Sequence, residues 1–98
     1  NIDVSVANVN FGPGCRNDWH IHHDGFQILL VTAGEGWYQE EGKPAQKMHP
    51  GDVVAIHEGV KQWHGATKDS WFSHIAITKG TSEWCEKVTD EEYDLLPD

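Results

Sequence analysis

Two histidines stand two positions apart at His20 and His22, and the amide side chain of Gln27 follows five positions later. In a strand, residues two apart project from the same face, so these two imidazoles lie side by side. Neutral imidazoles are good ligands for transition metals. We therefore predict a metal site here, with Gln27 placed against the imidazoles by a hairpin partner strand that begins past a turn at Asp24 and Gly25.

A second group of polar side chains lies in the latter half of the chain. Gln62 and His64 are also two positions apart. His74 points to the same side of its expected strand as Phe72 and Ala76. A small barrel fills its interior with apolar side chains, and an unpaired buried polar group costs about 1–3 kcal/mol. Several polar groups that converge inside a barrel therefore need a partner such as a metal ion or ordered water.

Short apolar runs separated by Gly, Pro and Asp predict the strands that position these side chains. The expected strands cover residues 2–11, 26–32, 37–41, 45–49, 53–56, 62–66 and 70–78. Only residues 89–96 look helical, because Thr89 can cap a helix and Glu92 stands at the capping-box position. Seven or eight short strands with regular turns are typical of a sandwich or barrel. We expect the acidic helix to lie on the barrel or at a subunit contact.

The length and composition narrow the possible classes of protein. A chain of 98 residues predicts one domain, residues 1–98, that needs no disulfide. A net charge of −9 argues against nucleic acid and anionic membranes as partners, and no apolar run approaches the length of a membrane span. Cys15 and Cys85 lie far apart, which indicates two buried free thiols and a cytoplasmic protein. We expect Trp19 and Trp63 to pack outside the barrel lumen or at a dimer contact.

The first half of the chain resembles the first sequence motif of the cupins. That motif consists of Gly, five residues, His-x-His, three or four residues, Glu, six residues and Gly. Here Gly14, His20, His22, Gln27 and Gly34 meet every spacing, with Gln in place of Glu. The resemblance implies an all-β fold, a single small cupin barrel of the jelly-roll type with a short C-terminal helix.

The second cupin motif is matched in spacing but not in residue type. The motif consists of Gly, five residues, Pro-x-Gly, two residues and His. This chain has Gly51, His57, Gly59 and Gln62 at those positions. His57 thus replaces the proline, and Gln62 replaces a histidine that binds metal in the family.

The chain most resembles small manganese-dependent cupins with hydroxynitrile lyase activity and cupins associated with carboxymuconolactone decarboxylases. The supporting stretches are residues 31–34, 49–54, 63–66, 74–77 and 88–91. The resemblance implies one divalent metal, with Mn as the first expectation and Fe, Ni or Zn as alternatives. Its implied ligands are His20, His22, Gln27 and Gln62.

The expected chemistry follows from neutral ligands, which leave the full charge of a divalent ion to stabilise an alkoxide or enolate. His64 or His74 could move a proton near neutral pH. The resemblance implies that His74 faces a small-molecule substrate, with Ala7, Val9 and Thr78 near the pocket. The predicted function is a metal-dependent lyase acting on a small hydroxylated or carbonyl compound. Cleavage of a cyanohydrin to an aldehyde and cyanide is the reaction that the resemblance indicates.

The residue at position 62 leaves three outcomes open, because two imidazoles and two neutral amides form a weaker site than three imidazoles and one amide. The site could keep its metal with lower affinity. His64, on the same face as Gln62, could supply a third nitrogen. The site could also be empty.

Two other functions are compatible with the same residues. One is a cupin dioxygenase that uses Fe or Mn. The other is a non-catalytic barrel that binds a small ligand and has a degenerate metal site. In every case we expect a homodimer or higher homo-oligomer, since cupins of this size usually pair through strand edges, which protects those edges.

Overall fold

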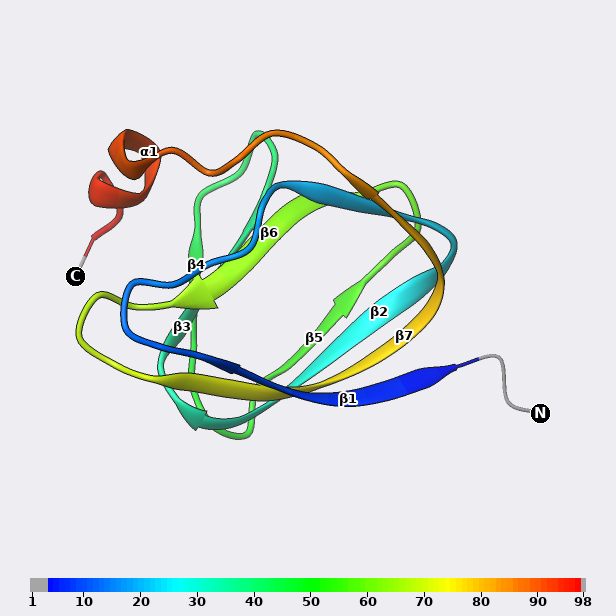
Figure 1. Ribbon diagram of the computed structural model, residues 1–98, viewed down its shortest axis with the longest axis horizontal. Helices are drawn as coiled ribbons and strands as arrows, with labels where there is room; N and C mark the ends of the chain where they lie inside the picture. Colours follow the sequence, from blue (N-terminus) through cyan, green and yellow to red (C-terminus); the bar gives the residue numbers. More distant parts are fainter. Residues whose placement is uncertain (1–3, 98) are drawn as a thin grey trace.

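The computed structural model describes residues 4–97, a curled antiparallel β-sheet with one short helix near the C-terminal end (Figure 1). The elements are β1 Ser5–Phe11, β2 His20–Gly34, β3 Gly36–Glu40, β4 Gln46–Met48, β5 Val53–Ile56, β6 Lys61–Ala66, β7 Phe72–Trp84 and α1 Asp90–Asp94. The order of paired strands is β1-β7-β2-β6-β3-β4, and β5 also pairs with β2. The predicted all-β fold of the jelly-roll type is confirmed.

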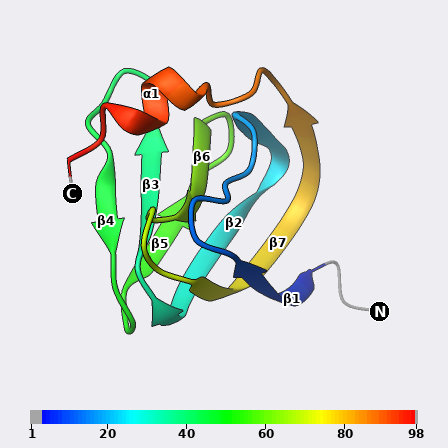
Figure 2. The same cartoon turned by 60° about the vertical axis from the view of Figure 1, so that its left-hand side comes forward.

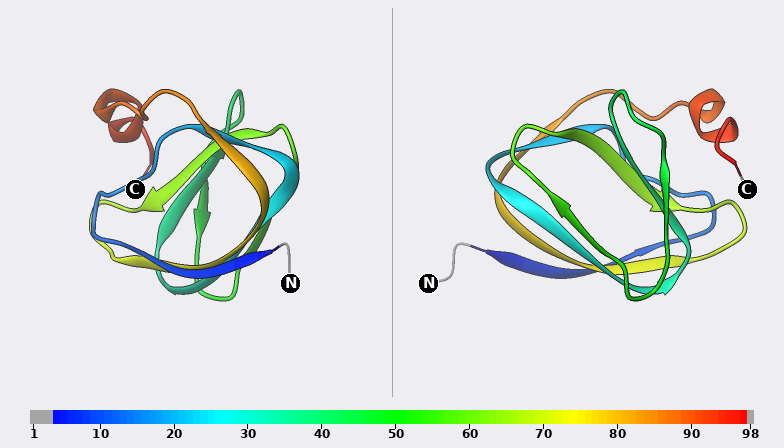
Figure 3. Two further views of the ribbon diagram at one scale, coloured as in Figure 1. Left: turned by 45° about the vertical axis from the view of Figure 1, so that its right-hand side comes forward. Right: turned by 180° about the vertical axis from the view of Figure 1, so that it is seen from behind.

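Strand β2 connects the two halves of the barrel. It pairs with β7 over most of its length, with β6 at His20 and Ile21, and with β5 from Gln27 to Leu30. Strands β1, β7, β2 and β5 form one wall, whereas β6, β3 and β4 form the other (Figures 2 and 3). The beginning of β2 therefore lies where the two walls meet.

The turn predicted at Asp24 and Gly25 is a β-bulge inside β2, so the expected hairpin is wrong. Three steps along β2, from His23 to Phe26, face only two steps along β7. Asp24 has a φ of 60°, and a Cβ at Gly25 would lie 2.1 Å from the carbonyl oxygen of Lys79. The two residues thus absorb one extra position without reversing the chain.

The bulge changes which side chains of β2 face the interior. In a regular strand, residues five positions apart point to opposite faces. The extra residue restores the parity, so His22 and Gln27 are both buried. Leu29 and Val31 continue the same face of the strand.

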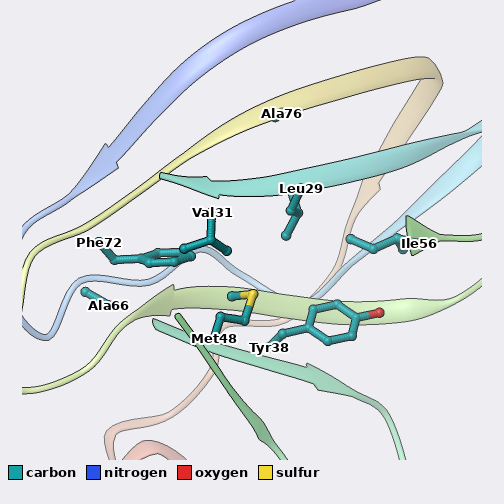
Figure 4. Packing of buried hydrophobic residues seen from close by; sticks show 8 residues of the cluster. All are labelled: Leu29, Val31, Tyr38, Met48, Ile56, Ala66, Phe72 and Ala76. Atoms are coloured by element: carbon teal, nitrogen blue, oxygen red, sulfur yellow. The ribbon is translucent and has the colours of Figure 1, made fainter. Parts of the chain in front are cut away.

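An apolar cluster fills the part of the interior next to these polar residues (Figure 4). It consists of Leu29, Val31, Tyr38, Met48, Ile56, Ala66, Phe72 and Ala76. Burying one large apolar side chain contributes about 1.5–3 kcal/mol relative to leaving it exposed. The cluster therefore stabilises the same strands, β2 and β7, that carry the polar side chains.

A second cluster lies outside the barrel lumen, against α1. It consists of Trp19, Trp37, Trp63, Val88 and Tyr93. The expectation that two of these tryptophans pack outside the lumen is confirmed. The predicted capping box at the start of α1 is also present, although the helix is shorter than expected and ends at Asp94.

Three further expectations are corrected or limited by the structure. Strand β7 does not end at Thr78 but continues to Trp84, because it keeps pairing with the first half of β2. Both cysteines are free as expected, but Cys15 is exposed and Cys85 only partly buried. The expected start of the first strand at Ile2 lies outside the described residues. In the described part of the chain, no helix is long and apolar enough to cross a membrane.

The bulge predicts that a methyl group at position 25 is poorly tolerated. Gly25→Ala should lower the free energy of unfolding by about 1–3 kcal/mol or more, because the new Cβ collides with backbone that cannot easily move. Gly12→Ala is the matched control, since its Cβ would meet side-chain atoms no closer than 3.8 Å. Chemical denaturation of both variants tests this expectation, and equal effects would contradict it.

Candidate metal centre

Six polar side chains are buried together inside the barrel. They are His20, His22, Gln27, Gln62, His64 and His74. Strand β2 contributes three of them, β6 two and β7 one. The structure thus brings together every residue that the sequence proposed as a ligand or as a proton carrier.

His20 presents one ring nitrogen to the interior and binds backbone with the other. Its Nδ1 lies 2.8 Å from the carbonyl oxygen of Asp18, which can only accept a hydrogen bond. Nδ1 therefore carries the proton, and Nε2 keeps a free lone pair. Metal-binding histidines commonly have this arrangement, in which the outer nitrogen donates to a carbonyl group.

His22 and Gln27 are in direct contact. Nε2 of His22 lies 2.9 Å from Oε1 of Gln27, and Nδ1 lies 3.3 Å from Oγ of Ser82. The Gln27 amide is oriented by its nitrogen, which donates to Oγ1 of Thr78 at 3.1 Å. The amide oxygen of Gln27 consequently faces the imidazoles, as a metal ligand must.

Gln62 contacts the same centre with a different atom. Its Nε2 lies 2.8 Å from Nε2 of His20, and its Oε1 lies 3.3 Å from Nδ1 of His64. Because Nε2 of His20 is an acceptor, the Gln62 amide nitrogen donates to it. The amide nitrogen, which does not bind metals, therefore faces the centre.

Three of the four implied ligands fit a divalent cation. His20 turns the lone pair of Nε2 inward and Gln27 turns its amide oxygen inward, and each is held by a hydrogen bond on the outer side. Nε2 of His22 donates to Oε1 of Gln27 in this structure, so metal binding requires its proton to move to Nδ1, beside Oγ of Ser82. Gln62 would have to exchange the positions of its amide oxygen and nitrogen. Among residues 4–97, no three His, Cys, Asp or Glu side chains form a metal-binding group. A centre at this place therefore needs at least one amide oxygen as a ligand.

His74 is buried without a hydrogen-bond partner. Neither of its ring nitrogens makes a well-aligned hydrogen bond with the described residues, although the backbone of Ile75 lies close enough to raise its pKa slightly against the effect of burial. Its ring centroid lies 5.0 Å from that of His64, and the rings of Phe11 and Phe72 lie 5.9 and 5.4 Å away. Because an unpaired buried polar group is costly, His74 is suited to contact a bound small molecule.

Burial controls the protonation of the four histidines inside the barrel. Removal from water lowers the pKa of His20, His22, His64 and His74, most strongly for His64, where the neighbouring imidazoles lower it further. The hydrogen bond from His20 to Asp18 offsets part of this effect. The rings are therefore neutral near pH 7, which is the form that binds metals and accepts protons.

The residues expected to line the pocket lie at different depths. Strand β1 pairs Val9 with His74, and Val9 packs partly buried against the apolar cluster. Thr78 accepts the hydrogen bond from Gln27. Ala7 lies farther along β1 and is exposed. The structure thus places Val9 and Thr78 beside the polar group and Ala7 at its edge.

Four residues that contact the centre were not identified from the sequence. Asp18 and Ser82 bind His20 and His22, and the ring of Trp84 lies 4.6 Å from that of His20. Ser82 and Trp84 would have been found if the last strand had been extended, since they share the parity of Thr78. Asn17, which binds His64, lies in an irregular segment that carries no recognisable pattern.

Comparison with known proteins shows the family to which the chain is related. The family model of the cupin domain matches residues 7–78. An (R)-mandelonitrile lyase of Granulicella tundricola is 47% identical over 94 residues, which are 92% of this chain and 71% of that protein. A putative germin-like protein of Arabidopsis thaliana is 30% identical over 73 residues, and the chain spans only 32% of its length.

Solved structures show the same fold. A cupin-like protein from Thermotoga maritima is 48% identical and superposes with a TM-score of 0.89, over 93% of this chain and 71% of that one. A DMSP lyase from Ruegeria pomeroyi has a TM-score of 0.74 at 21% identity, over 90% of this chain and 46% of that one, so it shares the fold alone. On this sequence and structural evidence, the chain belongs to the cupin family.

Proposed function

We propose that this cupin is a metal-dependent lyase of the hydroxynitrile lyase type, which cleaves a small cyanohydrin into an aldehyde and cyanide. The observation that carries the proposal is that His20, His22 and Gln27 are buried side by side: the imidazole centroids of His20 and His22 lie 5.0 Å apart, and His22 contacts Gln27. In the same interior, His74 makes no well-aligned hydrogen bond. The 47% identity to an (R)-mandelonitrile lyase supports this reaction class.

His20, His22 and Gln27 are the residues that would hold one divalent ion. We propose Mn²⁺ ahead of Fe²⁺, Ni²⁺ or Zn²⁺, because an oxygen ligand beside two imidazoles suits manganese. When bound, the ion supplies Lewis acidity to the substrate oxygen. Neutral ligands do not reduce its charge, which favours that role.

The walls around His74 are suited to a substrate with an apolar group. The ring of Phe11 lies 5.9 Å from that of His74 and 5.8 Å from that of His64, and Val9 lies opposite His74 on β1. These side chains exclude water from the imidazoles. An apolar group of the substrate would pack against them while its hydroxyl group faces the polar side chains.

His74 is better placed than His64 to move the proton. Both ring nitrogens of His64 lie within hydrogen-bond distance of an amide group, that of Gln62 or Asn17, whereas those of His74 make no well-aligned hydrogen bond among the described residues. Neutral His74 would accept the hydroxyl proton of the cyanohydrin at a ring nitrogen. The O–H electron pair then forms the carbonyl bond while the C–C bond to the nitrile breaks, and its pair leaves on cyanide. His74 returns the proton to cyanide, so no electrons are gained or lost.

A second candidate function, a non-catalytic barrel that binds a small ligand, is supported by one contact. The Gln62 amide donates a hydrogen bond to Nε2 of His20, the lone pair that a metal ion would use. In that case the other histidines and the amides would pair with one another through hydrogen bonds, and His74 would be the polar side chain that contacts the ligand.

Loss of metal tests the proposed ligands. His20→Ala should lower the metal content of the purified protein by at least about tenfold, because one of the three well-oriented ligands is gone. His23→Ala is the control, since His23 faces outward and pairs with Glu83. Element-resolved mass spectrometry measures the metal per chain, and circular dichroism verifies the fold. Full metal in the His20 variant would refute the assignment.

Position 62 can be tested by restoring the family residue. Gln62→His should raise the affinity for Mn²⁺ by about tenfold or more, because an imidazole nitrogen replaces the inward amide nitrogen. Gln46→His adds the same side chain at an exposed position of β4 and should leave the affinity unchanged. Calorimetric titration of both variants gives the answer, and an unaltered affinity in the Gln62 variant argues against a ligand at this position.

The reaction itself predicts release of aldehyde and cyanide from mandelonitrile by the Mn²⁺-loaded protein. His74→Phe should lower kcat/KM by about 10²- to 10⁴-fold, the contribution of a positioned acid or base, while preserving the aromatic packing. His49→Ala, at an exposed position beside Glu35, should not change it. Oxygen uptake without cyanide release would indicate a dioxygenase instead. Ligand-induced stabilisation without turnover or metal would indicate the binding barrel.

A further inference from the structure

The outer face of the wall formed by β1, β7, β2 and β5 is covered with apolar side chains. Two rows of cross-strand neighbours run over it, and each row takes one residue from every strand. The first row is Val6, Ile77, Ile28 and Ala55, and the second is Asn8, Ile75, Leu30 and Val53. All eight side chains point away from the interior and are at least partly exposed, because the alternate residues, such as Leu29 and Ala76, are buried inside the barrel. Seven of the eight are apolar and none is charged.

Polar residues lie beyond both rows. Lys79 and Glu83 continue the outward positions of β7 on one side, where Glu83 contacts His23 at 2.6 Å. On the other side, Asn10 pairs with Ser73. An apolar centre with a polar rim is the usual anatomy of a protein–protein interface. Contiguous apolar patches of this kind on a monomer commonly mark such a contact.

The outer face has a projection at one edge and a hollow at the other. Val6, on the edge strand β1, is 68% exposed. Near the opposite edge, a hollow with largely apolar walls is lined by Phe26, Ile28, Ala55 and His57. Val6 and Ala55 belong to the same row and are three strand spacings apart, about 14 Å. A two-fold axis parallel to the strands, midway between β7 and β2, therefore brings Val6 of each copy over the hollow of the other.

The charge of the chain restricts where two copies can meet. Its 16 acidic and 7 basic residues give a net charge of −9, so identical chains repel each other over most of their surface. The two rows contain no carboxylate, and contact there brings no like charges together at the centre of the interface.

The outer face also has the size that a dimer needs. Four strands about 4.8 Å apart and about 23 Å long cover about 400–500 Å² in projection. A stable interface buries about 800 Å² on each copy, including its polar rim. The rows can therefore supply the centre of such an interface, with the rim and the relief of the side chains adding to it.

We propose that two copies of this chain pack face to face through the two rows and form a symmetric dimer. Sheets packed in this way lie about 10 Å apart, with the side chains of the two faces interdigitated. Val6 of each copy enters the hollow beside Ala55 of the other. This arrangement differs from the edge-to-edge pairing expected from the sequence, which would leave both rows exposed to water. It does not depend on the proposed metal chemistry.

Sedimentation velocity over a concentration series tests the dimer with two variants of matched charge, Val6→Asp and Leu95→Asp. Both replace an exposed apolar side chain by a carboxylate, and Leu95, which is 81% exposed at the end of α1, lies outside the rows. The wild type should be a dimer. Val6→Asp should raise its dissociation constant by at least about 30-fold, because symmetry buries two carboxylates in apolar hollows. Leu95→Asp should leave it unchanged. A monomeric wild type, or equal constants for the two variants, overturns the proposal.

Cross-linking distinguishes packing through the face from pairing through the edge. Val6→Cys and Ala55→Cys are made separately in a chain whose two free cysteines are replaced, Cys15→Ser and Cys85→Ser. A bismaleimide with a reach of about 10 Å, the separation of packed sheets, should join the chains in an equimolar mixture of the two variants. Neither variant alone should be joined. A cross-link in Val6→Cys alone would indicate pairing of two β1 edges, and this result or the lack of a cross-link in the mixture overturns the proposal.

Discussion

The need to pair buried imidazoles and amides is the constraint on which this barrel depends. Six polar side chains occupy an interior that is otherwise lined by aliphatic and aromatic groups. Each polar group without a partner would cost on the order of 1–3 kcal/mol. Five of the six are hydrogen-bonded to one another or to nearby groups, and His74 alone makes no well-aligned hydrogen bond among the described residues. The interior is thus a hydrogen-bonded network in which one imidazole, that of His74, remains unpaired. A bound small molecule could supply the missing hydrogen bond.

The sequence predicted the barrel and the inward histidines because both depend on local rules. Alternation along a strand placed His20 and His22 together, and short apolar runs between turn residues indicated an all-β fold. The sequence placed Gln27 beside the histidines, but by way of a hairpin that the structure does not contain. Asp24 and Gly25 form a pair typical of hairpins, but residues that tolerate positive φ also suit bulges. Which of the two forms is decided by the partner strand β7, whose length the sequence underestimated.

The remaining features of the site depend on contacts between distant segments. The amide of Gln62 could have faced the site with either atom, and its residue type alone does not select one. The choice comes from the carbonyl group of Asp18, which leaves Nε2 of His20 as an acceptor for the amide nitrogen, and from Nδ1 of His64 beside the amide oxygen. Those residues belong to an irregular segment and a separate strand. Directional polar contacts of this kind require the fold to be known first.

The bulge in β2 takes up the four residues between His22 and Gln27, the longer of the two spacings that the cupin motif allows between its second histidine and the following ligand. With three intervening residues the separation is even, and a regular strand carries both side chains to the same side. With four, as between His22 and Gln27, the separation is odd, and one residue must be taken up outside the alternation. The shorter form satisfies this arithmetic with an unbroken ladder, whereas the longer form relies on Gly25, where backbone from the adjoining strand leaves no space for a side chain. The number of residues between the second histidine and the following ligand thus predicts whether this strand is regular or bulged before the ligands themselves are identified.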